Sequence, residues 1–161
     1  MKTLIVYAGK TGTTKECASI LADKLNNVTI MDLVKENPNI SDYDLIIIGS
    51  SIRMGMMHSA VKKFIKDNKE LLKTKEVAYF ICCAFPENAE ENFKRNLPNE
   101  LLEKAIVCEC FGGTMDLSKQ KGFDRFVVNM ISKSPEGKRE IKILDENIDR
   151  FVKKINDYMI K

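Results

Sequence analysis

The chain opens with Leu4-Ile5-Val6-Tyr7-Ala8-Gly9-Lys10-Thr11-Gly12-Thr13-Thr14, and no other segment says as much about its architecture. The apolar residues at the start predict a buried strand, and helical spacing follows from about Thr13 to Leu25. Between them lies a turn made almost entirely of glycine and threonine. Because backbone N–H groups and the helix dipole favour an anion at such a helix N-terminus, the turn predicts a phosphate cradle.

The residues of this turn indicate which class of phosphate ligand it could bind. It lacks the Gly-Lys-Ser/Thr of a P-loop and the third glycine of the dinucleotide-binding turn. Neutral hydroxyls and amides suit a terminal monoester, such as the 5′-phosphate of FMN. The predicted binding residues of the turn are Gly9, Lys10, Thr11, Gly12, Thr13 and Thr14. The residues alone also allow an ordinary strand-to-helix turn with Thr11 or Thr13 as the N-cap.

Predicted strands and helices alternate along the whole chain, which is typical of a doubly wound α/β fold. The expected strands are Thr3–Tyr7, Val28–Met31, Asp44–Gly49, Glu76–Cys82 and Ala105–Cys110. The expected helices are Thr13–Leu25, Ser59–Leu72, Ala89–Arg95, Lys119–Ser132 and Glu146–Ile160. We therefore expect one domain over residues 1–161, a three-layer sandwich whose five-stranded parallel sheet has the order 2-1-3-4-5 with helices on both faces.

Composition excludes several classes of function. The net charge is +3, from 26 basic and 23 acidic residues that are mixed along the chain, so we expect no nucleic-acid partner. No apolar run is long enough for a transmembrane segment, and no signal peptide is apparent, so we expect a cytoplasmic protein. The five cysteines are an odd number and there is one histidine, which favours buried reduced thiols over a disulfide framework or a metal site.

Three segments carry a resemblance to known families. The turn at residues 7–14, with Ala18 downstream, resembles the flavodoxin signature, although Gly9 stands where many flavodoxins have serine. The segment Gly49-Ser50-Ser51-Ile52-Arg53-Met54-Gly55-Met56-Met57-His58-Ser59-Ala60 resembles that of menaquinone-dependent protoporphyrinogen IX oxidases, as does Phe123-Asp124-Arg125-Phe126. The similarity runs from Met1 to about Lys154 and implies a flavodoxin-like fold with FMN as the cofactor.

The resemblance also implies a function. It suggests an FMN-dependent oxidoreductase that takes electrons from a porphyrinogen and passes them to a quinone, with peripheral contact to a membrane. One alternative is a plain flavodoxin electron carrier that serves a redox partner protein; the basic balance argues against it, because typical flavodoxins are acidic. A second alternative is a non-redox interaction module, against which the threonine-rich turn argues.

The expected strand order brings two further loops to the same edge of the sheet, where they would flank the flavin ring. The loop after the third strand contributes Ser50, Ser51, Ile52, Arg53, Met54 and Gly55, and the loop after the fourth contributes Cys83, Ala84, Phe85 and Asn88. Either Met54 or Gly55 is expected to offer a backbone carbonyl to the flavin. Phe85 either covers the ring or closes the core.

Two side chains are candidates for a catalytic role. Arg53 would stabilise the anionic reduced flavin by its charge, unless it only forms a surface ion pair. His58 would relay a proton, unless it caps the following helix or faces solvent.

Overall fold

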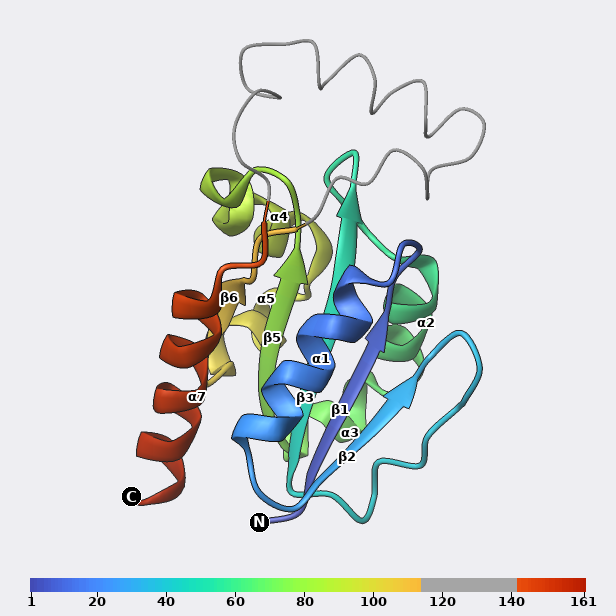
Figure 1. Cartoon of the computed structure of the whole chain (residues 1–161). Coiled ribbons are helices and arrows are strands. Elements are labelled where there is room, and N and C mark those ends of the chain that lie inside the picture. Colours follow the sequence, from blue (N-terminus) through green and yellow to red (C-terminus); the bar gives the residue numbers. More distant parts are fainter. Residues whose placement is uncertain (114–141) are drawn as a thin grey trace, which may run out of the picture.

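A computed structural model describes residues 1–113 and 142–161 of the chain (Figure 1). The strands are β1 Thr3–Ala8, β2 Val28–Asp32, β3 Leu45–Arg53, β4 Met56–Met57, β5 Glu76–Cys82 and β6 Cys108–Cys110. The helices are α1 Thr13–Lys24, α2 Ser59–Asp67, α3 Lys69–Thr74, α4 Ala89–Asn96, α5 Asn99–Lys104 and α7 Asp145–Met159, with a 3-10 turn, η1, at Pro86–Asn88.

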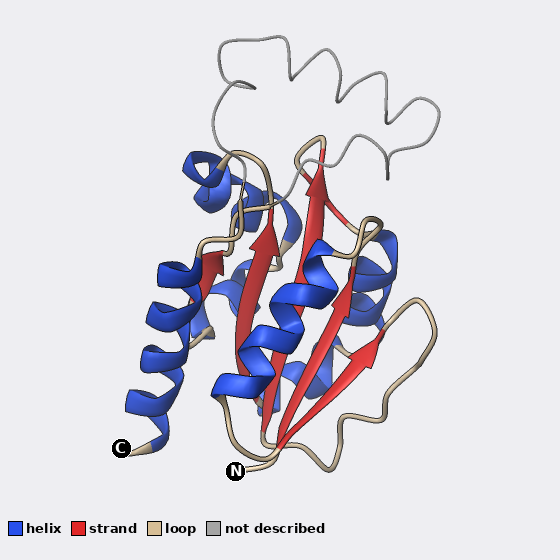
Figure 2. Cartoon of the chain, in the orientation of Figure 1, coloured by secondary structure: helices blue, strands red, loops and turns tan. Residues whose placement is uncertain are grey.

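The sheet has the order β2-β1-β3-β5-β6, and all four pairings along this path are parallel. This confirms the predicted order 2-1-3-4-5, with β5 and β6 as its fourth and fifth strands. The short strand β4 lies off the path and pairs antiparallel with β3. Parallel strands that follow one another need helical crossovers, and Figure 2 shows these helices on both faces of the sheet.

Each face of the sheet has its own hydrophobic core. Strand residues alternate between them: Leu4 and Val6 of β1 pack under α2–α5, while Ile5 packs under α1 and α7. The second core also holds a row of rings, in which Phe80 stacks on Phe111 with centroids 4.7 Å apart. Figure 1 shows α1 and α7 side by side on that face. With both faces covered, β1, residues 45–50 of β3 and residues 77–82 of β5 are buried, which explains the continuous aliphatic sequences of these strands.

The structure differs from the sequence prediction in several elements, among them β4 at Met56–Met57, which was not predicted. The helix expected over Ser59–Leu72 is broken at Asn68, whose side-chain amide donates to the Phe64 carbonyl at 2.9 Å and ends α2. Helix α5 was missed, because only Pro98 at its N-cap marks its start. The strand expected from Ala105 begins only at Cys108. The predicted helix Lys119–Ser132 lies outside the described residues.

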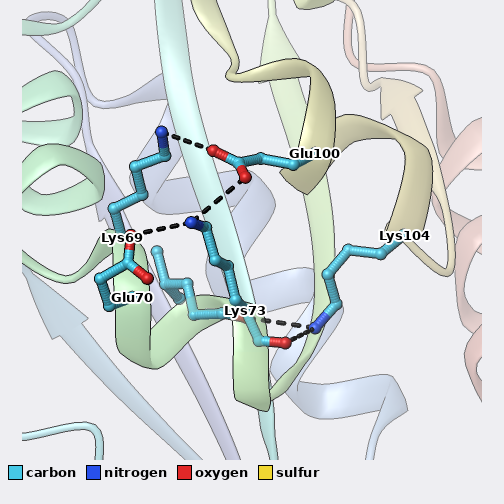
Figure 3. Close-up of polar contacts among 6 residues, drawn as sticks. Lys69, Glu70, Lys73, Glu100 and Lys104 are labelled. Carbon is cyan, nitrogen blue, oxygen red and sulfur yellow. Dashed lines mark hydrogen bonds and ion pairs between the residues drawn. The ribbon is translucent and has the colours of Figure 1, made fainter.

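An ion-pair network joins α3 to α5 on the outer surface (Figure 3). Glu100 lies between Lys69 and Lys73, at 2.5 and 3.2 Å from their ammonium nitrogens, and Lys73 also contacts Glu70 at 2.8 Å. The Lys104 ammonium donates to the carbonyls of Leu72, Lys73 and Lys75, where α3 ends. A cation at a helix C-terminus satisfies carbonyls that have no intrahelical partner, so Lys104 fixes the connection from α3 to β5.

The length and composition of the described helices show whether any of them could cross a membrane. None of those in residues 1–113 and 142–161 has both the length and the apolar character that a bilayer crossing requires.

Candidate functional site

The candidate site lies at the carboxyl edge of the sheet. Strands β1, β3 and β5 are neighbours and parallel, so the loops that follow them emerge at the same edge (Figure 1). In doubly wound folds this edge is where ligands bind, at the point where the strand order reverses. Here the reversal falls between β1 and β3, which brings the first two predicted loops together.

The first loop connects β1 to α1 and is shaped by two glycines. Gly12 is the N-cap of α1 and has φ 93°, a left-handed conformation that glycine adopts without strain. A Cβ added to Gly9 would lie 2.6 Å from the Thr14 hydroxyl oxygen, so the backbone there approaches closer than a side chain permits. The two glycines therefore shape a tight turn that leads directly into a helix N-terminus, the kind of backbone on which phosphate groups bind in other proteins.

The threonines of this loop are placed at different depths. Thr13 and Thr14 are buried in the first turn of α1, whereas Thr11 is half-buried and Lys10 is exposed. No side chain caps α1, so the alternative of Thr11 or Thr13 as an ordinary N-cap is wrong. The N-cap of α1 is the glycine of this turn, Gly12.

The second loop is a β-hairpin. Strand β3 continues to Arg53, and Ile52 and Arg53 pair with Met57 and Met56 of β4. The two residues at the tip both have positive φ, 52° for Met54 and 74° for Gly55, as in the two-residue turns that suit hairpins. Met54 is 76% exposed, so its side chain projects from the molecule beside the candidate site.

Asn96 of α4 holds this hairpin, and sequence reasoning missed it. Its side-chain amide donates to the Gly55 carbonyl at 2.8 Å, and its oxygen accepts the Met57 N–H at 2.9 Å. A Cβ on Gly55 would lie 2.0 Å from the Arg95 guanidinium, so α4 packs directly against the tip. Asn96 comes 41 residues after Gly55, and no local pattern relates the two.

Ser50 braces the hairpin from inside. It is fully buried, its hydroxyl accepts the His58 N–H at 2.9 Å, and it donates to the Ser51 carbonyl at 2.9 Å. The bond from His58 ties the end of the second loop to its beginning. Ser50 thus positions the loop, while Ser51, Ile52 and Arg53 are half-buried and lie nearer the surface.

His58 is the N-cap of α2, as the capping alternative predicted. Its Nδ1 accepts the Ala60 N–H at 3.1 Å, so the neutral ring carries its proton on Nε2. Burial lowers the pKa of His58 from the usual 6.5, and the positive charges of Lys10 and Arg53 lower it further against the opposing effect of Asp32. His58 is therefore neutral at physiological pH and offers Nε2–H as a donor.

The third loop follows β5. Cys83 is buried, Ala84 and Phe85 are half-buried, and Asn88 is exposed at the end of η1. Phe85 is thus not part of the closed core, which leaves its ring accessible at the edge. Gly113 lies against this loop, since a Cβ there would be 3.5 Å from the Cys83 carbonyl.

The cysteines are free thiols, as expected. All five lack disulfides, and only Cys108 is not fully buried. Within the described ranges, no group of three or more His, Cys, Asp or Glu side chains gathers closely enough to hold a metal ion. The motif at Phe123–Phe126 lies outside the part of the chain that the structure describes.

Comparisons with known proteins agree with this architecture. Residues 4–142 match the family model described as a flavodoxin domain. The protoporphyrinogen IX dehydrogenase [quinone] of Escherichia coli is 28% identical over 96% of this chain and 94% of its own.

Solved structures share the fold at lower identity. A flavoprotein from Lactobacillus acidophilus, crystallised in complex with FMN, is 19% identical, with a TM-score of 0.52 over 73% of this chain and 95% of its own. A putative flavoprotein from Bacteroides eggerthii is 17% identical, with a TM-score of 0.53 over 81% of this chain and 95% of its own. The family model covers most of the sequence and the strand order agrees with it, so the chain belongs to the flavodoxin domain family.

Proposed function

We propose that this protein binds FMN at the carboxyl edge of β1, β3 and β5 and works as an FMN-dependent oxidoreductase. The observation that carries the proposal is the backbone of the first loop, where Gly9 closely approaches Thr14 and left-handed Gly12 precedes α1. The N–H groups of this loop, with the hydroxyls of Thr11 and Thr13, would hold the phosphate. When bound, FMN supplies a ring that takes up two electrons from an organic substrate and releases them to an acceptor.

The hairpin and the third loop would enclose the ring. Met54 of the hairpin and Phe85 of the third loop both have accessible apolar side chains, and a thioether packs well against an aromatic plane. Of the two carbonyls considered at the tip, that of Gly55 already accepts the Asn96 amide. The Met54 carbonyl is therefore the one that we assign to the ring.

Charge at the site favours a reduced, anionic ring. Lys10 and Arg53 both lie near enough to His58 to lower its pKa, so the three side chains converge on one region. Arg53 would stabilise negative charge through this field. Neutral His58, held by its Nδ1 bond, would present Nε2–H as a donor to substrate or cofactor.

For the substrate, we infer a porphyrinogen, and for the acceptor, a quinone. The support is the relative from Escherichia coli, whose name states both and which aligns with 96% of this chain. The net charge of +3 also differs from that of an acidic electron shuttle. A plain carrier remains the second candidate, because the exposed Met54 and Met56 would equally suit contact with a protein partner.

The test is anaerobic turnover by the full chain loaded with FMN. Protoporphyrinogen IX and a soluble menaquinone analogue are mixed with protein, and porphyrin fluorescence is followed. We expect fluorescence to rise only when protein and quinone are both present, and Arg53→Met to slow it at least tenfold. FMN binding without turnover would reject the oxidase and favour the carrier, whereas absence of FMN binding would reject both.

A further inference from the structure

Two cysteines lie side by side where neighbouring strands end: Cys83 directly follows β5, and Cys110 is the last residue of β6. The sulfur atoms of Cys83 and Cys110 lie 3.2 Å apart, although the residues are 27 positions apart in sequence. A disulfide has an S–S distance of about 2.05 Å, so bond formation requires each sulfur to move by roughly 0.6 Å. From these positions, we propose that Cys83 and Cys110 are a redox-active dithiol that a peroxide converts reversibly to a disulfide.

The two sulfurs have unequal environments, which assigns their roles. Cys110 Sγ accepts the Gly112 N–H at 3.4 Å and lies in hydrogen-bond contact with the Cys83 thiol. Cys83 Sγ donates to the Phe85 carbonyl at 3.5 Å. Hydrogen bonds from Cys83 and Gly112 lower the pKa of Cys110 against the effect of burial, while the pKa of Cys83 is raised. Cys110 is thus the attacking thiolate and Cys83 the resolving thiol.

A route to the attacking sulfur is present. Cys110 lines a cavity of about 490 Å³ between β6 and the η1–α4 segment, together with Cys108, Phe93 and Pro86. Hydrogen peroxide is little larger than water and fits this space. Cys108 lines the same cavity but has no sulfur partner among the contacts of the described residues, so it serves as a matched control.

The chemistry balances with peroxide as the oxidant. The Cys110 thiolate attacks one peroxide oxygen, so that an S–O bond forms, the O–O bond breaks, and hydroxide leaves and takes a proton to become water. Cys83 then attacks the sulfenic sulfur of Cys110, an S–S bond forms, and the S–O bond breaks with release of a second water. Two thiols are oxidised by two electrons and one peroxide is reduced.

The test uses the full chain, its reduced thiols and hydrogen peroxide. Peptide mapping by mass spectrometry should find a linkage between the segments holding Cys83 and Cys110, with loss of two hydrogens, that dithiothreitol reverses. Cys82 lies in the same tryptic peptide as Cys83, and Cys108 lies in the same one as Cys110. Two control variants, Cys82→Ser and Cys108→Ser, therefore show which cysteine of each peptide is linked, and both should retain the linkage. Cys83→Ser and Cys110→Ser should abolish it.

A second readout separates the two roles. In Cys83→Ser, peroxide should leave a sulfenic acid on Cys110 that dimedone traps, whereas Cys110→Ser should give no trapped product at Cys83. No linkage in the wild-type chain, or a linkage that survives in Cys83→Ser, would overturn the proposal. Circular dichroism of each variant confirms that it is folded, and the wild-type result decides the proposal even if a variant is not.

Discussion

Replacing Asn96 by alanine tests whether α4 holds the hairpin of the candidate site. The substitution removes two contacts to the hairpin: the bond to the Gly55 carbonyl and the bond from the Met57 N–H. It also removes a bond within α4 to the Asn92 carbonyl at 2.8 Å. The hairpin keeps its short β3–β4 pairing and the bond from the His58 N–H to Ser50.

The size of the effect follows from burial. Met57 is only 4% exposed, and leaving a buried donor without a partner costs about 1–3 kcal/mol. Gly55 is half-buried, so water replaces part of its lost bond, which adds about 0.5 kcal/mol. We expect Asn96→Ala to lower the free energy of unfolding by about 1.5–3.5 kcal/mol, which changes the folding equilibrium by a factor of about 10 or more.

Urea unfolding followed by circular dichroism measures this loss, with Asn99→Ala as the matched control. Asn99 is an exposed asparagine at the start of α5, and its replacement should change the free energy by less than about 0.5 kcal/mol. Hydrogen exchange adds a local readout, in which the Met57 amide loses protection and that of Val6 in β1 keeps it. Equal stability of Asn96→Ala and Asn99→Ala, with Met57 still protected, would refute the role assigned to Asn96.

Four further substitutions test other parts of the account. Gly9→Ala should weaken FMN binding at least tenfold in a fluorescence titration, because its Cβ would lie 2.6 Å from the Thr14 oxygen, whereas Gly113→Ala meets only ordinary contacts and should bind normally. Met54→Asn should raise the free energy of unfolding by about 1 kcal/mol, since asparagine tolerates the left-handed backbone at the hairpin tip better than methionine, and an unchanged or lower value would contradict this. The pKa of His58 is lower in the folded chain than its usual 6.5, so the unfolded chain binds more protons near that pH. The free energy of unfolding should therefore fall as the pH drops from about 7.5 to about 5.5. His58→Asn keeps a capping acceptor and should flatten this pH profile, and an equally steep profile in the variant would argue against His58 as its origin. Lys104→Met should lower the melting temperature by several degrees, because it removes the hydrogen bonds to the carbonyls at the end of α3. The control is Lys62→Met, which replaces an exposed lysine of α2 and should leave the melting temperature unchanged. Equal shifts in the two variants would mean that the carbonyl contacts of Lys104 contribute little to stability.

Local pattern was sufficient to predict most of the fold. The aliphatic runs at Leu4–Ala8 and Leu45–Ile48 correctly predicted central strands, because such strands are covered by helices on both faces of the sheet. The glycines and threonines of the first loop correctly predicted a turn. Glycine is required there, because Gly12 is a left-handed N-cap and the backbone at Gly9 lies close to Thr14.

The parts that could not be predicted depend on contacts between distant residues. The hairpin at Met54-Gly55 is held by a hydrogen bond from Asn96, which lies far away in the sequence. Its tip also has a methionine at a position where asparagine or glycine would have indicated a turn. The break at Asn68 depends on a side-chain bond within the helix, which apolar periodicity does not register. The proximity of Cys83 and Cys110 follows from the neighbouring positions of β5 and β6 in the sheet, which spacing in the sequence does not give.

The first experiment should be a titration of the purified full chain with FMN, followed in the visible absorption spectrum. The account predicts that the flavin bands shift and saturate at one FMN per chain, and that Gly9→Ala weakens this binding while Gly113→Ala does not. An unshifted spectrum at excess FMN, or equal binding by Gly9→Ala and the wild type, would contradict the assignment of the first loop as the phosphate site.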